Sequence, residues 1–322
     1  MMNDLAPDGA LSGTVRHLVP SDLDRAVAID RDLSGSSRRG FFEKRLGSSE
    51  AHPESFVSLG YTIGGGELEG LVLARIIDGE FGTPHPAAFL DAIGTTAKVR
   101  GQGGARLLLD TLMEKLKRRG VCELRTQTLW SDRSLSGFFA SAGFSLWPGL
   151  VLERVCGRLD GEVVPGEAAD SQEDLSRDRV PVRLLKATDL PAVVAIDRRI
   201  TGRDRTDYYR RKFHEVLNES GIRLSMIATL DDTAAGFIMA RVDYGEFGMT
   251  RPEAVMDTIG VDPELIGRDA GSALLTVLLG NLGSLMVETV RTEVSWNNYA
   301  LLAFLEERGF RPSQRLNLAR AL

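Results

Sequence analysis

Three glycines between an arginine and a run of leucines form the stretch with the clearest chemical meaning, VRGQGGARLLL (99–109). A helix beginning there exposes unpaired backbone N–H groups and the positive end of its dipole, which together stabilise an anion. Gly101, Gly103 and Gly104 let a phosphate approach the backbone, and Arg100 can add a charge-assisted contact. A loose turn before a core helix has the same residue pattern. The stretch alone therefore predicts either a phosphate cradle or a plain turn.

The chain contains this region twice. Residues 73–144 align without a gap with residues 239–310 at a shift of 166, and 24 of the 72 positions are identical. Upstream, residues 15–38 align with 182–205 at a shift of 167, with 12 of 24 identical. A two-copy repeat of this length predicts tandem domains, here termed copy one and copy two, rather than a solenoid.

The expected organisation has four segments: a flexible tail at 1–14, an N-terminal domain at 15–156, an acidic linker at 157–180 and a C-terminal domain at 181–322. The linker contains GRLDGEVVPGEAADSQEDLSRDR, which has few large apolar residues. Such a segment buries too little surface to offset the entropy lost on ordering.

Composition excludes several classes of function. The 322 residues are 43% hydrophobic and 26% charged, which suits two globular domains. No apolar run approaches the roughly 18 residues of a membrane span, and no leader pattern is present, so we expect a cytoplasmic protein. Two cysteines and four scattered histidines predict neither a disulfide framework nor a metal site. A formal charge of −6 without a basic stripe argues against nucleic-acid binding.

The elements that position the glycine stretch follow the same order in both copies. After a first strand, SDLDRAVAID and TDLPAVVAID predict helices capped by Ser21 and Thr188. Strand-like runs follow, ending in FLDAIGTT (89–96) or VMDTIGVD (255–262) before the glycine turn and a leucine-rich helix. A strand, a helix closed by glycine and a final short strand complete each copy. The expected class is α/β (α+β), with a mixed, mostly antiparallel sheet flanked by helices.

This order, with R-x-x-G-x-A at Arg100, Gly103 and Ala105 and a later helix ending in Gly-Phe, resembles the core of the GCN5-related N-acetyltransferases (GNAT). The resemblance covers nearly all of both copies. It implies acetyl-coenzyme A as co-substrate, no metal, and a glycine stretch that cradles the pyrophosphate. The implied coenzyme contacts are Ile93, Gly94, Thr95, Val99, Arg100, Gly101, Gln102, Gly103, Gly104, Ala105, Arg106 and Phe139.

The resemblance also implies a general base, a carboxylate on the strand before the glycine turn. The matching residue is Asp91, with Asp257 in copy two, and either would act through a bridging water. The alternative is that both aspartates only hold the end of the strand. The family's frequent acid, a tyrosine before the final Gly-Phe, is replaced by Phe139 and Leu305. A thiol of pKa about 8.5 can still leave without full protonation.

Acceptor binding is implied for the first two helices, which form a wall of the acceptor cleft in the family. Asp30, Arg31 and Arg38 would then bind a substrate carboxylate or amine, and copy two repeats all three. An internal Asp–Arg pair that fixes the helix connection is the alternative, and we favour it. Trp130 and Trp296, together with the two GEFG segments, are interpreted as core and turn elements.

Copy two departs from the family pattern in LIGRDAGSALL, where Ile266 and Asp269 replace Arg100 and Gly103. A carboxylate beside a pyrophosphate is repelled by about 1 kcal/mol or more. Copy one departs less, with Gly94-Thr95-Thr96-Ala97 where the family has Val-x-Pro. We therefore expect copy one to bind the coenzyme and copy two to bind it poorly.

Three classes of function remain open. The favoured one is an acyltransferase that moves an acetyl group to a primary amine of a small molecule or a protein. The second is a non-catalytic acyl-coenzyme A sensor, which the absence of the tyrosine supports. The third is a structural pair of domains without a ligand. We expect no nucleic-acid or membrane partner, and a homodimer is compatible with the sequence.

Overall fold

The computed structural model describes residues 13–77, 86–156, 180–219, 222–243, 245, 247 and 253–322. The expected linker lies outside these ranges except for Val180, and the expected tail lies outside them up to residue 12. Gly13 already belongs to the first strand, so the fold begins two residues earlier than predicted. In the described ranges, no helix is long and apolar enough to cross a membrane.

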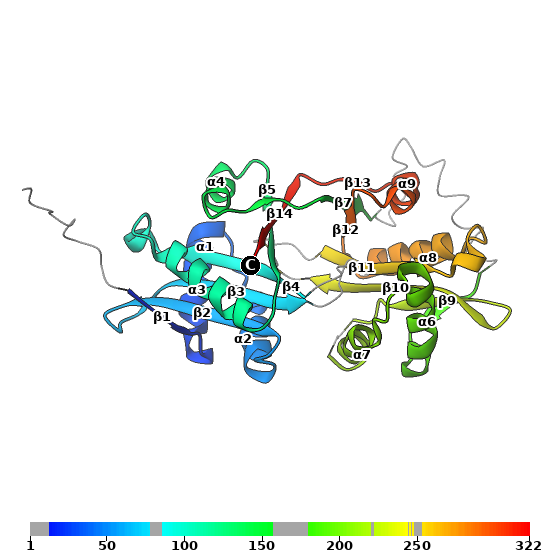
Figure 1. Cartoon of the computed structure of the whole chain (residues 1–322), viewed down its shortest axis with the longest axis horizontal. Coiled ribbons are helices and arrows are strands. Elements are labelled where there is room, and N and C mark those ends of the chain that lie inside the picture. The colour runs from blue at the N-terminus through cyan, green and yellow to red at the C-terminus, as the bar shows by residue number, and fades with distance from the viewer. Residues whose placement is uncertain are drawn as a thin grey trace, which may run out of the picture.

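Copy one follows the predicted order of elements with two differences: a second helix, Arg39–Ala51, stands between the first helix and the strand-like runs, and two strands rather than one end the copy (Figure 1). Its strands are β1 (Gly13–His17), β2 (Phe56–Ile63), β3 (Leu68–Ile77), β4 (Ala87–Thr95), β5 (Glu123–Leu129), β6 (Ser145–Leu146) and β7 (Gly149–Val155). Its helices are α1 (Leu23–Ser34), α2 (Arg39–Ala51), α3 (Gly104–Arg118) and α4 (Arg133–Ser141).

Copy two repeats the series, as its sequence predicts. Its strands are β8 (Val182–Leu184), β9 (Met226–Leu230), β10 (Thr233–Asp243), β11 (Glu253–Val261), β12 (Thr289–Ser295), β13 (Arg311–Pro312) and β14 (Arg315–Ala321). Its helices are α6 (Leu190–Thr201), α7 (Thr206–His214), α8 (Ala270–Ser284) and α9 (Tyr299–Glu307). A π-helical turn at Glu215–Glu219 follows α7 directly.

Each sheet is covered by helices on both faces, which explains why its strands are apolar on both sides. In copy one, Leu112 of α3 and Phe139 of α4 share one core with the sheet. Phe42 of α2 and Ile29 of α1 form another core, against Leu71 of β3. In copy two, α8 and α9 cover one face, and α6 and α7 cover the other. The predicted fold class, a mixed and mostly antiparallel sheet flanked by helices in each copy, is confirmed.

The two copies exchange their last strands. One sheet has the order β1-β2-β3-β4-β5-β14-β6 and the other β13-β7-β12-β11-β10-β9-β8. Strand β14 pairs with β5 over its whole length, and β7 pairs with β12 in the equivalent way. The sheets therefore do not close at the predicted domain limits. Residues 149–155 complete the sheet of copy two, and residues 315–321 complete that of copy one.

Buried polar groups join the sheets where the strands cross. Glu293 of β12 accepts from Gln127 of β5 (Nε2 to Oε1, 2.6 Å) and from Asn317 of β14 (Nδ2 to Oε2, 2.7 Å). Burial raises the pKa of Glu293 despite these contacts and the nearby guanidinium groups. Nearby, Arg315 of β14 binds Glu253 of β11 at 2.8 Å. The exchange is thus accompanied by polar contacts between the sheets.

Two local predictions are wrong. Ser21 does not cap α1, because a 3-10 turn at Pro20–Asp22 precedes the helix and Asp22 instead accepts from the Val19 N–H at 2.9 Å. Asp189 does the same at the start of α6, in place of Thr188. Each aspartate also binds an arginine of the first strand of its copy.

The matched tryptophans are not core residues. Trp130 is 61% exposed and Trp296 is 49% exposed. Both follow a strand directly, and their backbone N–H groups bond to Gln314 and Pro148, which connect to the exchanged strands. The GEFG segments lie mostly outside the described residues.

Candidate functional site

The glycine stretch forms the N-terminus of α3. Gly101 and Gly103 have φ of +77° and +84°, and Gly103 is the N-cap of the helix. A Cβ atom added at either would meet nothing within 4 Å, so backbone conformation rather than space favours glycine here. The Leu107 N–H makes the first bond of the helix, to Gly103 at 2.9 Å. The backbone N–H groups of residues 103–106, which precede Leu107, are those that a helix leaves available for an anion.

The predicted coenzyme contacts divide by exposure. Arg100, Gly101, Gln102, Gly103 and Arg106 are exposed around the loop. Arg106 also pairs with Asp110 of its own helix at 3.0 Å. The loop is therefore accessible and bears a positive side chain on either side of its glycines.

The side chains of Val99 and Phe139 are buried rather than exposed around the loop. Both side chains are only 1% exposed and pack in the core beneath α3. The Phe139 ring packs on Phe144 with centroids 5.1 Å apart. The contacts observed for these two residues are packing contacts, and their contact with a coenzyme stays a prediction.

Copy two keeps the backbone of the loop and changes its chemistry. Gly267 and Asp269 have φ of +82° and +61°, matching Gly101 and Gly103, and Asp269 is the N-cap of α8. Asp269 is exposed, and Ile266, at the position of Arg100, is 71% exposed. Copy two therefore presents a carboxylate and an apolar side chain where copy one presents a glycine and an arginine.

Next to the loop, β4 and β5 diverge. Their parallel ladder covers only the first residues of each strand and ends at Phe89 opposite Arg125, although β4 runs on to Thr95. Beyond that point the Thr126 hydroxyl donates to the Leu90 carbonyl at 3.0 Å. β11 and β12 diverge after two ladder pairs in the same way. Each copy thus has a V-shaped gap between two strands whose facing backbone groups are outside the ladder.

Asp91 lies at a β-bulge beside this gap, because the register of β4 on β3 shifts between Leu90 and Ala92. Its side chain is 1% exposed and is bound by Arg75 of β3 (Nε, 3.2 Å) and Arg45 of α2 (Nε, 3.1 Å). Two guanidinium groups thus neutralise the carboxylate and hold it in place. This geometry favours the structural interpretation of Asp91 over a general base.

Asp257 occupies the equivalent bulge of β11. Lys212 of α7 binds it at 3.0 Å and Arg241 of β10 lies 3.6 Å from it. The pairing of one aspartate with one cation from the second helix and one from the central strand is therefore common to both copies.

The predicted acceptor residues form an internal pair. Arg38 binds Asp30 through both Nε (2.9 Å) and Nη2, and both residues are buried. Arg38 also donates to the Gly245 carbonyl of copy two. The third predicted residue of copy one, Arg31, is exposed. In copy two, Arg205 binds Asp197 at 2.9 Å. The favoured alternative, an Asp–Arg pair that fixes the helix connection, is what the structure contains.

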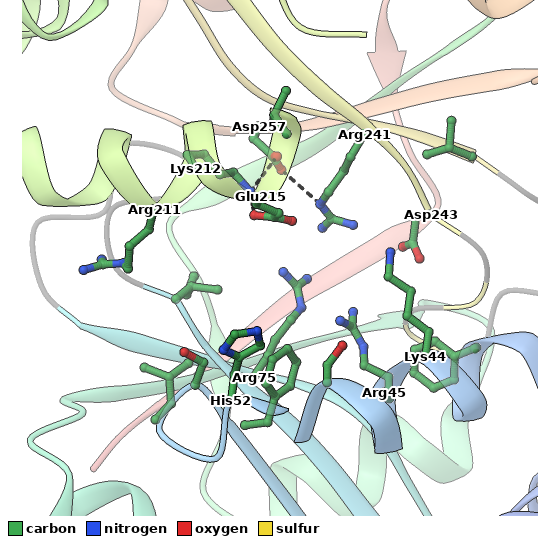
Figure 2. A pocket seen from close by; sticks show the side chains of 18 of the residues that line it. Lys44, Arg45, His52, Arg75, Arg211, Lys212, Glu215, Arg241, Asp243 and Asp257 are labelled. Atoms are coloured by element: carbon green, nitrogen blue, oxygen red, sulfur yellow. Dashed lines mark hydrogen bonds and ion pairs between the residues drawn. The ribbon is translucent and has the colours of Figure 1, made fainter. Parts of the chain in front are cut away.

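A cavity between the copies is the feature that the sequence did not reveal. Its volume is about 740 Å³, and α2, α7 and the inner strands β3, β10 and β11 line it. Figure 2 shows Arg45 and Arg75 of copy one extending toward Glu215 and Arg241 of copy two. Helical spacing is the signal that could have indicated this wall: Phe41, Arg45 and Ser48 recur along one face of α2, and its cap residues Arg38 and His52 continue the spacing.

The comparison with known families decides the class of the protein. The sequence pattern of the acetyltransferase (GNAT) family matches residues 26–144 and again 190–310. The chain belongs to the GNAT family. One GNAT fold is therefore matched in each copy, in agreement with the resemblance found in the sequence.

Relatives of the chain are distant. It is 30% identical over 129 residues to a ribosomal protein bS18 alanine N-acetyltransferase of Salmonella typhimurium, a match covering 40% of this chain and 79% of that enzyme. Among solved structures, a tandem GNAT protein from the clavulanic acid biosynthesis pathway has a TM-score of 0.64 at 17% identity, covering 96% of this chain and 98% of that one.

Two further structures have the same fold. The glucosamine N-acetyltransferase region of a fungal multi-domain β-N-acetylglucosaminidase has a TM-score of 0.66 at 15% identity, and the chain covers 38% of that protein. A GNAT protein of Sphaerobacter thermophilus has a TM-score of 0.61 at 16% identity, with 98% of this chain and 97% of that one covered. At these identities the likeness concerns the fold alone.

Proposed function

We propose that this GNAT protein transfers an acetyl group from acetyl-coenzyme A to a primary amine, with the donor site in copy one. The observation that carries the proposal is the exposed loop at the N-terminus of α3, where Gly101 and Gly103 have positive φ beside Arg100. Backbone N–H groups, the helix dipole and a guanidinium together favour a pyrophosphate.

The V-shaped gap beside the loop suits the rest of the coenzyme. A pantetheine arm is an extended chain with amide groups, and it can bond to strand edges as an added strand does. The edges of β4 and β5 after Phe89 and Arg125 are outside the ladder and offer such groups. A chain that lies in this gap reaches the bulge at Asp91, so the thioester would arrive beside the cavity.

Chemistry at that point needs a neutral amine as nucleophile. Arg45 and Arg75 lie on either side of Asp91 and line the cavity. Positive charge near an ammonium group favours its loss of a proton, because like charges disfavour the charged form. In this proposal Asp91 is a positioning residue that orients the two guanidinium groups, and water in the cavity takes the proton.

The non-catalytic sensor differs from the enzyme only in the transfer step. Phe139 lies on α4 with its side chain buried in the hydrophobic core, and a phenyl ring cannot donate a proton to a leaving thiolate. The enzyme must therefore release a thiolate, which a pKa of about 8.5 permits at neutral pH with reduced efficiency.

The experiment is a thiol-release assay on the intact chain with acetyl-coenzyme A and a panel of amines. The proposal expects amine-dependent release of coenzyme A and the acetylated amine by mass spectrometry, both strongly reduced in Gly103→Asp when acetyl-coenzyme A is below saturation. Saturable binding of acetyl-coenzyme A without transfer to any amine would favour the sensor. Absence of binding would refute both.

A further inference from the structure

We propose that the cavity between the copies binds an acceptor that carries an anionic group as well as its amine, and that both copies contribute cations to this group. The inference rests on the proposed function for the role of the ligand as acceptor, but its evidence is the cavity itself.

Equivalent positions of the two copies line the cavity from opposite sides. On the second helices these are Phe41 and Tyr208, Lys44 and Arg211, Arg45 and Lys212, and Ser48 and Glu215. On the inner strands they are Arg75 and Arg241, Ile76 and Val242, and Ile77 and Asp243. The cavity thus lies between like surfaces of a duplicated unit, and no single copy encloses it.

The lining is rich in positive charge, whereas the whole chain is acidic. Among the described residues that line the cavity, eight are Lys or Arg and two are His, against four Asp or Glu. The chain as a whole has a formal charge of −6. Asp91 and Asp30 lie behind the wall, bound to Arg45 and Arg38, and even with them the cations are in excess. A partly enclosed positive surface concentrates anions.

The two walls differ in charge. The wall of copy one contains Arg38, Arg39, Lys44, Arg45 and Arg75 with Glu54 as its lining carboxylate. The wall of copy two contains three cations and three carboxylates, which are Glu215, Asp243 and Asp257. The acids Glu215 and Asp243 stand where copy one has Ser48 and Ile77. Positive charge is therefore concentrated on the side of the donor copy.

The cations also have suitable chemistry for an oxyanion. Guanidinium groups offer paired N–H donors that match carboxylate or phosphate oxygens. Arg75 and Arg241 project into the cavity from the equivalent strands β3 and β10 (Figure 2). Their ion pairs with Asp91 and Asp257 fix their orientation, so little further ordering is needed on binding. The ligand class that fits is an amine bearing a carboxylate or a phosphate.

The first test measures anion binding with citrate as the probe, by calorimetry on the intact chain with the coenzyme site saturated by coenzyme A. The equivalent positions supply opposed variants: Glu215→Ser removes a carboxylate from the cavity, and Ser48→Glu adds one. Lys212 keeps Asp257 when Glu215 is removed. Glu50→Ser, an exposed charge change on α2 outside the cavity lining, is the control.

We expect Glu215→Ser to tighten citrate binding about threefold to tenfold, Ser48→Glu to weaken it by a similar factor, and Glu50→Ser to leave it within twofold. Raised salt should weaken binding in every variant. Absence of saturable citrate binding, or equal affinities in all four proteins, would overturn the inference.

The second test measures transfer to amines that differ only in charge: β-alanine against β-alaninamide, and O-phosphoethanolamine against ethanolamine. The inference expects kcat/KM to be at least tenfold higher for the anionic member of at least one pair. The pair showing the preference identifies carboxylate or phosphate as the group bound. Equal or better transfer to both neutral members overturns the inference and leaves the proposed function standing. Citrate binding in the expected order without transfer refutes the proposed function and leaves the anion site standing.

Discussion

Gly103→Asp transfers the residue of copy two to the loop of copy one, and it tests whether this loop binds the coenzyme. A unit charge about 5 Å from a phosphate charge costs about 3 kcal/mol at an effective dielectric of about 20, and salt reduces this. Allowing for screening and lost backbone contacts, we expect a loss of about 2–4 kcal/mol. Acetyl-coenzyme A should therefore bind roughly thirty- to a thousandfold more weakly.

The fold should survive the change. Gly103 has φ of +84° with nothing within 4 Å of a Cβ, so the cost is conformational and of the order of 1 kcal/mol. Asp269 adopts φ of +61° at the equivalent position, which shows that this turn accommodates aspartate. Thermal unfolding of the variant should therefore remain cooperative and close to that of the parent.

Calorimetry on the intact chain measures the affinity, and Gly103→Asn is the matched control. Asparagine tolerates the same backbone conformation and has nearly the same size without the charge. We expect Gly103→Asn to lose much less affinity than Gly103→Asp. If folded Gly103→Asp binds acetyl-coenzyme A as tightly as the parent, the loop is only a turn and the reasoning is refuted.

Three further predictions concern positioning, burial and the exchanged strands. Asp91→Asn should lower kcat/KM at least tenfold by releasing Arg45 and Arg75, without changing the shape of the pH profile of kcat/KM. Asp257→Asn should have a smaller effect. Loss of one limb of the pH profile in Asp91→Asn would instead indicate that Asp91 is a general base. Glu293→Gln introduces the residue that copy one has at the equivalent position, Gln127. Because burial raises the pKa of Glu293, the charged carboxylate destabilises the fold at pH values above that pKa, and protonation of Glu293 removes this destabilisation as the pH falls. Urea unfolding should show the variant more stable by about 1 kcal/mol at pH 8 and the gain shrinking toward pH 5, and a less stable variant at pH 8 would contradict the sign. Proteolysis confined to residues 157–179 should leave the two fragments associated in size-exclusion chromatography, because β7 and β14 lie in each other's sheets, and their separation would contradict the exchange.

The order of elements could be predicted from the sequence because each copy carries the same local signals. The leucine-rich helix predicted after the glycine turn is α3, in which Leu108, Leu109 and Leu112 are buried. The glycines expected to bare the backbone at the start of that helix do so, and Gly101 and Gly103 also have positive φ. These features depend on neighbouring residues and need no knowledge of how the copies are arranged.

The strand exchange could not be predicted, because the two last strands are near equivalents. β7 and β14 can satisfy the same ladder bonds in either sheet, so local pattern does not choose between them. The choice depends on contacts such as Glu293 with Gln127, which involve both copies. The same reason applies to the cavity, whose walls come from α2 and α7. In separated halves β7 could pair only with β5, and β14 only with β12, which is not the pairing of the intact chain, so binding is measured on the intact chain.

The exposed tryptophans show a different limit. A tryptophan at the end of a strand is more often a core or turn element than a ligand contact, which is the basis for expecting Trp130 and Trp296 in the core. Each tryptophan directly follows a strand and bonds through its backbone to the segment that leads into an exchanged strand. At that place the described part of the chain leaves about half or more of each side chain exposed. Residue type gave the general preference, and position in the assembled sheets overrode it.

The most direct test of the central claim, that copy one holds the acetyl donor, is hydrogen exchange of the intact chain with and without acetyl-coenzyme A. The account predicts slower exchange in peptides covering β4, the glycine loop and the start of α3, residues 90–107, and in the diverging end of β5. Peptides covering the equivalent loop of copy two, residues 265–273, should exchange at the same rate with and without the coenzyme. Protection confined to residues 265–273, or no protection in either loop at saturating acetyl-coenzyme A, would contradict it.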